Sequence, residues 1–183
     1  MLIEPTEIAD VKVITPRRFT DERGFFSEVF NARAFASIES NAFVQDNHSW
    51  SSQPFTIRGL HFQTVPRAQG KLVRVARGRI LDVAVDIRRS SPTFGKHVAV
   101  ELSAANWRQL WVPVGFAHGF CTLEPDTEVL YKVTDYYSAE HDFGLAFDDP
   151  ALGIAWPTAP EAAILSDKDR KHPRLAALSY AFE

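Results

Sequence analysis

Three side chains in this sequence combine the chemistry that a proton-transfer site needs. His61, Lys71 and Tyr131 supply an imidazole, an ammonium group and a phenol. An imidazole with an ordinary pKa of about 6.5 suits a base that works near neutral pH. A phenol can act as the acid, and an ammonium group can stabilise an enolate as its charge forms. Each residue alone is more often an ordinary core or surface residue, but the three together predict a site that removes and returns protons.

A fourth candidate, His118, follows a tight turn later in the chain. Residues 113–118 read Pro-Val-Gly-Phe-Ala-His, the spacing that precedes a metal-binding histidine in cupin proteins. The earlier segment 58–63 offers His61, but Gln63 stands where such a site has its second histidine, and no glutamate follows closely. Lys71 adds a positive charge that would repel a divalent cation. The sequence therefore predicts a pocket that holds no metal.

The segments that carry these residues alternate between apolar and other side chains, as β-strands do. Lys71 shares one face with the valines of segment 71–75, and Tyr131 shares one face with the valines of segment 128–133. His61 alternates with Ile57 and Gln63. If the apolar faces look into a barrel, all three polar heads project into its cavity. Strand parity thus predicts that base, acid and lysine meet.

Further alternating segments complete an all-β prediction. The segment 79–87 sets four apolar residues on one face and Asp82 and Asp86 on the other, as in a half-buried strand, and segment 97–102 alternates too. Breaks rich in Gly, Pro and Asp separate these runs, which favours an antiparallel β-sandwich or closed barrel. Short helices are expected within 32–40 and after Ser166, a plausible N-cap. Residues 1–183 are predicted to form one domain.

The composition sets bounds on location and partners. The chain has 183 residues, of which 45% are hydrophobic and 23% charged, as in an ordinary soluble domain. A net charge of −3 gives no general attraction to nucleic acid or to an anionic membrane, so a charged ligand needs local cations. The one cysteine, Cys121, is expected to be a small buried residue. No signal peptide or membrane span is evident, which predicts a cytoplasmic protein.

Eight segments, in order from about Asp21 to Asp169, resemble the dTDP-4-dehydrorhamnose 3,5-epimerase family. They are DERGFFSE (21–28), QDNHS (45–49), RGLHFQ (58–63), QGKLV (69–73), DVAVDIR (82–88), SPTFG (91–95), PVGFAHGF (113–120) and SDKD (166–169). Any one segment is modestly specific, but eight in family order over some four-fifths of the chain are very specific. The resemblance implies a cupin-type jelly roll, a homodimer and no cofactor.

The resemblance also assigns a reaction and the catalytic roles. It implies epimerisation at C3 and C5 of dTDP-4-dehydro-6-deoxy-D-glucose, a dTDP-4-keto-6-deoxyhexose, to dTDP-4-dehydro-L-rhamnose. His61 matches the family's base, and Asp169 matches the carboxylate that pairs with it. Tyr131 matches the acid that returns a proton to the opposite face. Lys71 is placed to stabilise the enolate on O4, and no redox cofactor is needed because the substrate already carries its keto group.

The family's substrate contacts fall on further residues. His118 matches a residue that lines the sugar site. Phe26 and one of Tyr136 or Tyr137, with Tyr137 preferred, are candidates for stacking on thymine. The matches to nucleotide or diphosphate contacts are Arg23, Glu28, Gln45, Asn47, Arg58 and Lys168. The cations among them supply the local positive charge that the net charge does not.

Two positions depart from this pattern. Asp142 stands where the family is expected to have a glutamate, so its substrate contact is one methylene shorter. Arg58 has the opposite strand parity to His61. If the strand is regular, Arg58 reaches a phosphate from the end of the strand or acts in the site of a partner subunit.

Three other functions fit the same residues. A family member could epimerise only C3 or only C5 of a related dTDP-4-keto-deoxysugar. A cupin-type sugar 3,4-ketoisomerase fits the pairing of His61 with Asp169 less well. A non-catalytic cupin that binds nucleotide sugars would keep Arg23, Arg58 and Lys168, but it would not need His61 and Tyr131 together.

Overall fold

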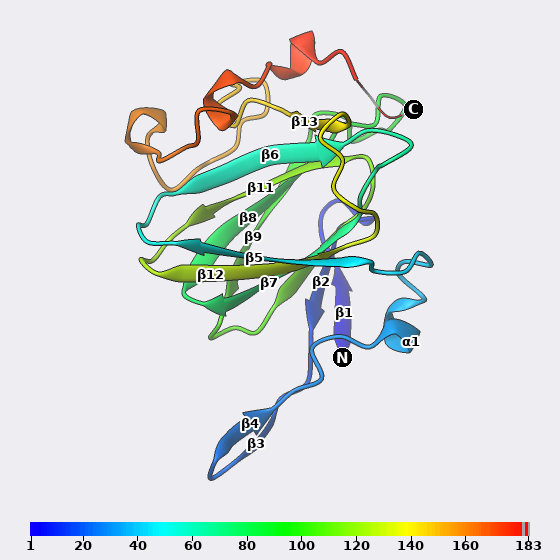
Figure 1. Ribbon diagram of the computed structural model, residues 1–183, viewed down its shortest axis with the longest axis vertical. Coiled ribbons are helices and arrows are strands. Elements are labelled where there is room, and N and C mark those ends of the chain that lie inside the picture. Colours follow the sequence, from blue (N-terminus) through cyan, green and yellow to red (C-terminus); the bar gives the residue numbers. More distant parts are fainter. Residues whose placement is uncertain (181, 183) are drawn as a thin grey trace.

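Two antiparallel sheets form the body of the protein, seen in a computed structural model that describes residues 1–180 and 182 (Figure 1). The six-stranded sheet runs in the order β1 (Leu2–Pro5), β2 (Lys12–Thr15), β10 (Gln109–Val112), β7 (Lys71–Arg77), β12 (Thr127–Val133) and β5 (Gln45–Ser51). The five-stranded sheet runs in the order β13 (Asp142–Gly144), β6 (Ile57–Gln63), β11 (Phe116–Thr122), β8 (Arg79–Asp86) and β9 (His97–Ser103).

The helices are short and lie outside the sheets. α1 covers Ala32–Phe35, where Asn31 accepts hydrogen bonds from two backbone N–H groups and so caps the first turn. The 3-10 helices are η1 (Pro160–Ala162), η2 (Asp169–Lys171) and η3 (Leu175–Ala177). The predicted all-β jelly roll with short peripheral helices is confirmed. No helix in the described part of the chain is long and apolar enough to cross a membrane.

The space between the two sheets holds the main core. Val73 and Val75 from β7 and Val129 from β12 pack against residues of β8, β9 and β11. Because side chains alternate along a strand, Lys71 and Tyr131 point from these same faces toward the space between the sheets. The predicted orientation of both strands is correct.

The predicted half-burial of β8 is wrong, because both of its faces are covered. Its apolar residues Val83 and Val85 pack outward with Leu60 of β6, against Leu145 and Leu152 of the segment after β13. Figure 1 shows this segment, in orange and red, lying over β6. The opposite face of β8 looks between the sheets, and Asp82 there has no exposed surface.

A hairpin of β3 (Phe19–Asp21) and β4 (Gly24–Phe26) projects from the body of the fold. It forms its own two-stranded sheet, and every residue of both strands is exposed. Phe26 at its end is 71% exposed. Phe19 and Phe25 are each 51% exposed as well, and a group of exposed apolar side chains is a common sign of a contact surface. We call residues 19–28 the arm.

Candidate active site

A cavity of about 470 Å³ opens between the two sheets. Its walls come from β6, β11, β7 and β12, and the segment that leads into η2 closes one side. The polar side chains that line it are Ser49, Thr56, Arg58, His61, Lys71, His118, Tyr131, Ser166, Lys168 and Asp169. A second cavity of about 180 Å³ shares His61, Lys71 and Tyr131 and adds Gln45, Asn47, Gln63, Tyr137 and Asp142. All four predicted catalytic residues therefore meet.

A bulge in β6 brings Arg58 to the same cavity as His61. His61 pairs with His118 on β11 and Arg58 pairs with Phe120, so three steps on β6 match two on β11. The bulge includes Gly59, where a side chain would meet backbone atoms of Gly119 at 2.5 Å. The extra residue reverses strand parity, so the expectation from a regular strand is wrong. Arg58 lines the cavity of its own chain.

His61 and Asp169 form a tight pair at the wall of the cavity. Nε2 of His61 lies 2.7 Å from Oδ1 of Asp169. The hydroxyl oxygen of Ser166 accepts the backbone N–H of Asp169 at 3.1 Å, so Ser166 holds the turn as a cap would. Burial alone would raise the pKa of Asp169, but the imidazoles of His172 and His61 outweigh it and hold that pKa below its usual range. Asp169 is therefore ionised at neutral pH.

The same environment leaves His61 ready to accept a proton. Burial lowers the pKa of His61 below 6.5. Asp169 opposes that effect without cancelling it, and Lys71 adds positive charge nearby. At neutral pH the ring is therefore mainly neutral. Since its Nε2 donates to Asp169, its Nδ1 carries the free lone pair.

Lys71 is buried beside the base. Its Nζ donates to the backbone carbonyl of His61 at 3.1 Å, which fixes the ammonium group in the cavity. Burial lowers the pKa of Lys71 from 10.5 to about 8, although Asp142 and Asp82 act against this. The group is still mostly charged at neutral pH, so it can face a developing anion.

Tyr131 reaches the cavity from the sheet opposite His61. It stands on β12, where it pairs with Val73 of β7 and Asn47 of β5. Burial raises the pKa of Tyr131 above 10, and Arg58 offsets this only in part. The phenol thus keeps its proton at neutral pH, as an acid must.

A second histidine–aspartate pair joins the cavity wall to the core, and only its histidine was predicted. Nε2 of His118 lies 2.7 Å from Oδ1 of Asp82, and both side chains are buried. Oδ2 of Asp82 has no hydrogen-bond partner among the described residues. Asp82 was taken for the polar side of a half-buried strand. No local sequence signal could have found it, because the burial of Asp82 depends on distant segments that cover the other face of β8.

The rim of the smaller cavity is a polar network around Asp142. Its carboxylate accepts hydrogen bonds from Lys168 and from the hydroxyl of Tyr137. Gln45 accepts the backbone N–H of Tyr137 at 3.1 Å and donates to Asn47 at 2.9 Å. The predicted contacts on β5, β13 and the C-terminal segment are thus brought together.

Gln63 has a structural role beside this rim. Its amide donates to the carbonyls of Arg67 and Tyr136, and its oxygen accepts the N–H of Ser138. Three possible ligand atoms, from His61, Asp169 and His172, do lie within 4.8 Å of one another. His61 and Asp169 already bond to each other there, and the charge of Lys71 lies close by. That the site holds no metal stays a prediction from these residues.

The arm lies away from the cavity of its own chain. Arg23 is bound to Asp21 within the hairpin, and its side chain is 85% exposed. Phe26 and Glu28 line neither of the two cavities around His61. The structure therefore does not bring these three predicted residues to the site.

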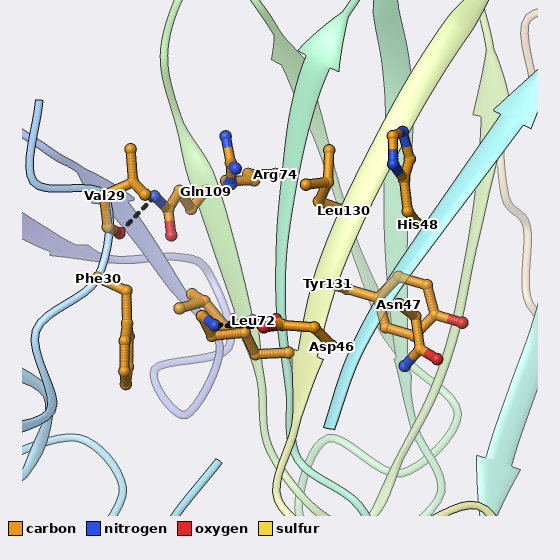
Figure 2. Close-up of a pocket in the computed structure, with 11 residues that line it drawn as sticks. Val29, Phe30, Asp46, Asn47, His48, Leu72, Arg74, Gln109, Leu130 and Tyr131 are labelled. Carbon is orange, nitrogen blue, oxygen red and sulfur yellow. Dashed lines mark hydrogen bonds and ion pairs between the residues drawn. The ribbon is translucent and has the colours of Figure 1, made fainter. Parts of the chain in front are cut away.

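A third cavity, of about 280 Å³, lies on the outer face of the six-stranded sheet (Figure 2). The side chains of Leu72, Arg74 and His48 point to this face, and Lys132 is bound to Asp46 across it. This cavity shares only Asn47 and Tyr131 with the two around His61. It has no imidazole–carboxylate pair beside a buried lysine, so the chemistry belongs to the inner cavity.

Comparison with known proteins shows which family the chain is similar to. A model of the dTDP-4-dehydrorhamnose 3,5-epimerase family matches residues 5–177. The dTDP-4-dehydrorhamnose 3,5-epimerase of Sinorhizobium fredii is 55% identical over an alignment that covers 100% of this chain and 94% of that relative.

Two solved structures show the same fold. RmlC of Legionella pneumophila, a dTDP-6-deoxy-D-glucose-3,5-epimerase in complex with dTDP-4-keto-L-rhamnose, is 46% identical with a TM-score of 0.92, and the match covers 97% of this chain and 94% of that one. ChmJ of Streptomyces bikiniensis, a 3'-monoepimerase in complex with dTDP-quinovose, is 31% identical with a TM-score of 0.88, and the match covers 94% and 87%.

Proposed function

The chain belongs to the dTDP-4-dehydrorhamnose 3,5-epimerase family, and from that premise we propose how its cavity converts dTDP-4-dehydro-6-deoxy-D-glucose to dTDP-4-dehydro-L-rhamnose. The reaction inverts C3 and C5, the two carbons next to the C4 ketone. The observation that carries the proposal is the 2.7 Å pair of His61 and Asp169, in a cavity whose opposite wall holds Tyr131.

His61 removes the proton. Its Nδ1 accepts the hydrogen from C3 or C5 while Nε2 stays bonded to Asp169. The ionised carboxylate fixes the tautomer and stabilises the imidazolium that forms. Asp169 thus acts on the substrate through the ring that it holds.

Lys71 stabilises the intermediate. Loss of a proton next to the ketone places negative charge on O4, and a buried ammonium group interacts with that charge far more strongly than it would in water. The bond to the His61 carbonyl keeps Lys71 beside the base, so base and counter-charge are fixed relative to each other.

Tyr131 returns the proton on the other face. Inversion requires removal from one side of the sugar ring and delivery to the other. His61 comes from the five-stranded sheet and Tyr131 from the six-stranded sheet. A sugar ring held between the two sheets would meet the base on one side and the acid on the other.

The nucleotide and diphosphate bind toward the mouth of the cavity. Arg58 and Lys168 supply positive charge there, and Gln45, Asn47 and Tyr137 supply hydrogen-bonding groups. His118 lines the sugar end. Asp142 takes part through its bonds to Lys168 and Tyr137, which place both groups at the rim.

We propose further that the protein works as a homodimer whose arms complete the two sites. Arg23, Phe26 and Glu28 lie on or next to an exposed hairpin that extends from its own subunit. An aromatic ring can stack on a base and a cation can pair with a phosphate only if they reach the bound nucleotide. An arm that extends from its own subunit could do so in the cavity of the partner subunit. A cytoplasmic location stays a prediction from the sequence.

Product configuration tests the proposed reaction against single-site epimerisation. Purified protein should convert dTDP-4-dehydro-6-deoxy-D-glucose to a keto sugar inverted at both C3 and C5, identified by proton coupling constants in NMR. A product inverted at one carbon alone would show a monoepimerase instead. Tight binding without turnover would show a binding protein.

The activity should also depend on pH in a way that the site sets. kcat/KM reports the free enzyme and needs His61 neutral and Lys71 charged. On the acid side, kcat/KM should decrease as His61 takes up a proton, with a limit that lies below pH 6.5. On the alkaline side, kcat/KM should decrease above a pH of about 8, as Lys71 loses its proton. Tyr131, with a pKa above 10, should not affect this window. An alkaline limit near 10 in place of 8 would contradict the role of Lys71.

A further inference from the structure

His172 occupies a place that the backbone keeps clear for it. It follows η2 directly, and its side chain is only 8% exposed. The ring packs over Gly144, where a Cβ atom would lie within 2.3–2.4 Å of three ring atoms. Gly144 is in turn the β13 partner of His61. Any larger residue at position 144 would therefore force this imidazole away from the base.

The ring of His172 faces the catalytic carboxylate. Its Nε2 lies 3.4 Å from Oδ1 of Asp169, the same oxygen that bonds to His61. The two imidazoles stand edge to face, with ring centroids 5.5 Å apart and planes at 80°. Nε2 is buried and has no hydrogen-bond partner in the described part of the chain. The 3.4 Å approach is thus an electrostatic contact that a small shift would close into a hydrogen bond.

Electrostatics decides which tautomer this geometry favours. A bare nitrogen lone pair pointed at an ionised carboxylate would be repelled, and its burial would cost free energy without any compensating bond. An N–H at the same place is attracted. Nε2 of His172 therefore carries a proton that points at Asp169.

We propose that His172 is a positioning residue of the proton-transfer site, which holds Asp169 from a second direction, next to His61. This inference rests on the proposed function. With two N–H groups directed at Oδ1 from neighbouring rings, the carboxylate stays ionised and keeps its orientation toward the base. The second donor also offsets part of the negative charge of the carboxylate, so Asp169 stabilises the imidazolium form of His61 less strongly. His61 therefore stays unprotonated at neutral pH and can accept a proton.

Other ionisable groups line the cavities that His61 faces, and they must stay constant in a test. They are Arg58 on β6, Lys71 on β7, His118 on β11, Tyr131 on β12, Asp142 on β13, and Lys168, Asp169 and His172 on the C-terminal segment. Substitutions at 172 and 144 alter none of them but His172.

Three variants separate the N–H of His172 from its packing. His172→Leu keeps much of the volume and removes the donor. His172→Gln keeps an N–H at a similar reach from the backbone. A double variant, His172→Ala with Gly144→Ala, refills part of the space without a donor.

The pKa of His61, followed by NMR of its ring in the free protein, is the first readout. It should rise by roughly 0.5–1 unit in His172→Leu and in the double variant, because a donor to Asp169 is lost, and stay near the wild-type value in His172→Gln. The acid limit of kcat/KM should move by the same amount. At neutral pH, kcat of His172→Leu and of the double variant should fall about 3–30-fold with KM unchanged, because Asp169 then orients the base less well.

An unchanged His61 pKa in His172→Leu, or a wild-type pKa in the double variant, would overturn the proposal, because packing alone would then explain His172. The nitrogen shifts of His172 in the wild type give a second test that needs no variant. A protonated Nε2 at neutral pH supports the proposal, and a bare Nε2 overturns it. Neither NMR measurement needs substrate, so each gives an answer even if the proposed reaction fails its own test.

Discussion

Replacing His61 by alanine should reduce turnover by about 10³–10⁴-fold, the upper range for loss of a positioned base. The physical reason is that no other described group faces the cavity with a free imidazole nitrogen while its second nitrogen bonds to Asp169. His118 is also an imidazole in the cavity, but it is tied to Asp82. Binding of the dTDP-sugar should change little, because the cations at the cavity mouth remain. Turnover and binding are measured by NMR and by calorimetry.

Two further variants make this result interpretable. His61→Gln keeps an N–H at about the reach of the Nε2 that bonds to Asp169, so it guards against a loss of folding caused by the unpaired carboxylate. His48→Ala is the matched control, because His48 is a histidine on the outer face of the six-stranded sheet. The control should turn over like the wild type. Turnover near the wild-type rate in His61→Gln would remove His61 from the role of base.

Replacing Tyr131 by phenylalanine should separate proton removal from inversion. The change deletes one hydroxyl and keeps the ring that packs against the core. His61 and Lys71 still remove the proton and hold the enolate, so hydrogen exchange with solvent should continue. Net inversion should fall by about 10²–10⁴-fold, because the proton then returns mostly to the face that it left.

The measurement is a pair of rates in D2O, one for exchange and one for inversion, in wild type and variant. Tyr180→Phe serves as a control, since Tyr180 is 45% exposed and lines neither cavity around His61. Equal losses in both rates would mean that Tyr131 is needed to form the enolate, and the division of labour between the two faces would be wrong.

The sequence predicted the strands that carry the base, acid and lysine because each pattern is local. Alternation in segments 71–75 and 128–133 marked β7 and β12, and parity on each strand turned Lys71 and Tyr131 inward. Cys121 is buried as expected, and burial raises the pKa of its thiol to about 12. Such features depend on near neighbours in the chain and so can be seen in the sequence.

Features that depend on distant segments could not be seen in this way. The same alternation in β8 has a different meaning. The segment after β13 covers the apolar face of β8, and the face with Asp82 looks between the two sheets. Parity also failed for Arg58, because a bulge in β6 adds one residue between Arg58 and His61. A bulge is set by the approach of β11 to Gly59, which no local pattern reports.

His172 was missed for a related reason. In the sequence it is a histidine near basic residues, in Arg170-Lys171-His172-Pro173, which suggests a surface. Its burial depends on space left by Gly144 on another strand. Pairs of this kind, one large residue and one absent side chain, become visible only once the fold has brought them together.

The central claim is that one group removes each proton and another group returns it from the opposite face. The most direct test is the conversion of dTDP-4-dehydro-6-deoxy-D-glucose by the wild-type enzyme in D2O, with deuterium at C3 and C5 of the product measured by NMR. Because the proton that Tyr131 delivers is drawn from solvent, every inverted carbon should carry deuterium from the first turnovers on. Product that is inverted at C3 or C5 but keeps its original hydrogen there would contradict the claim.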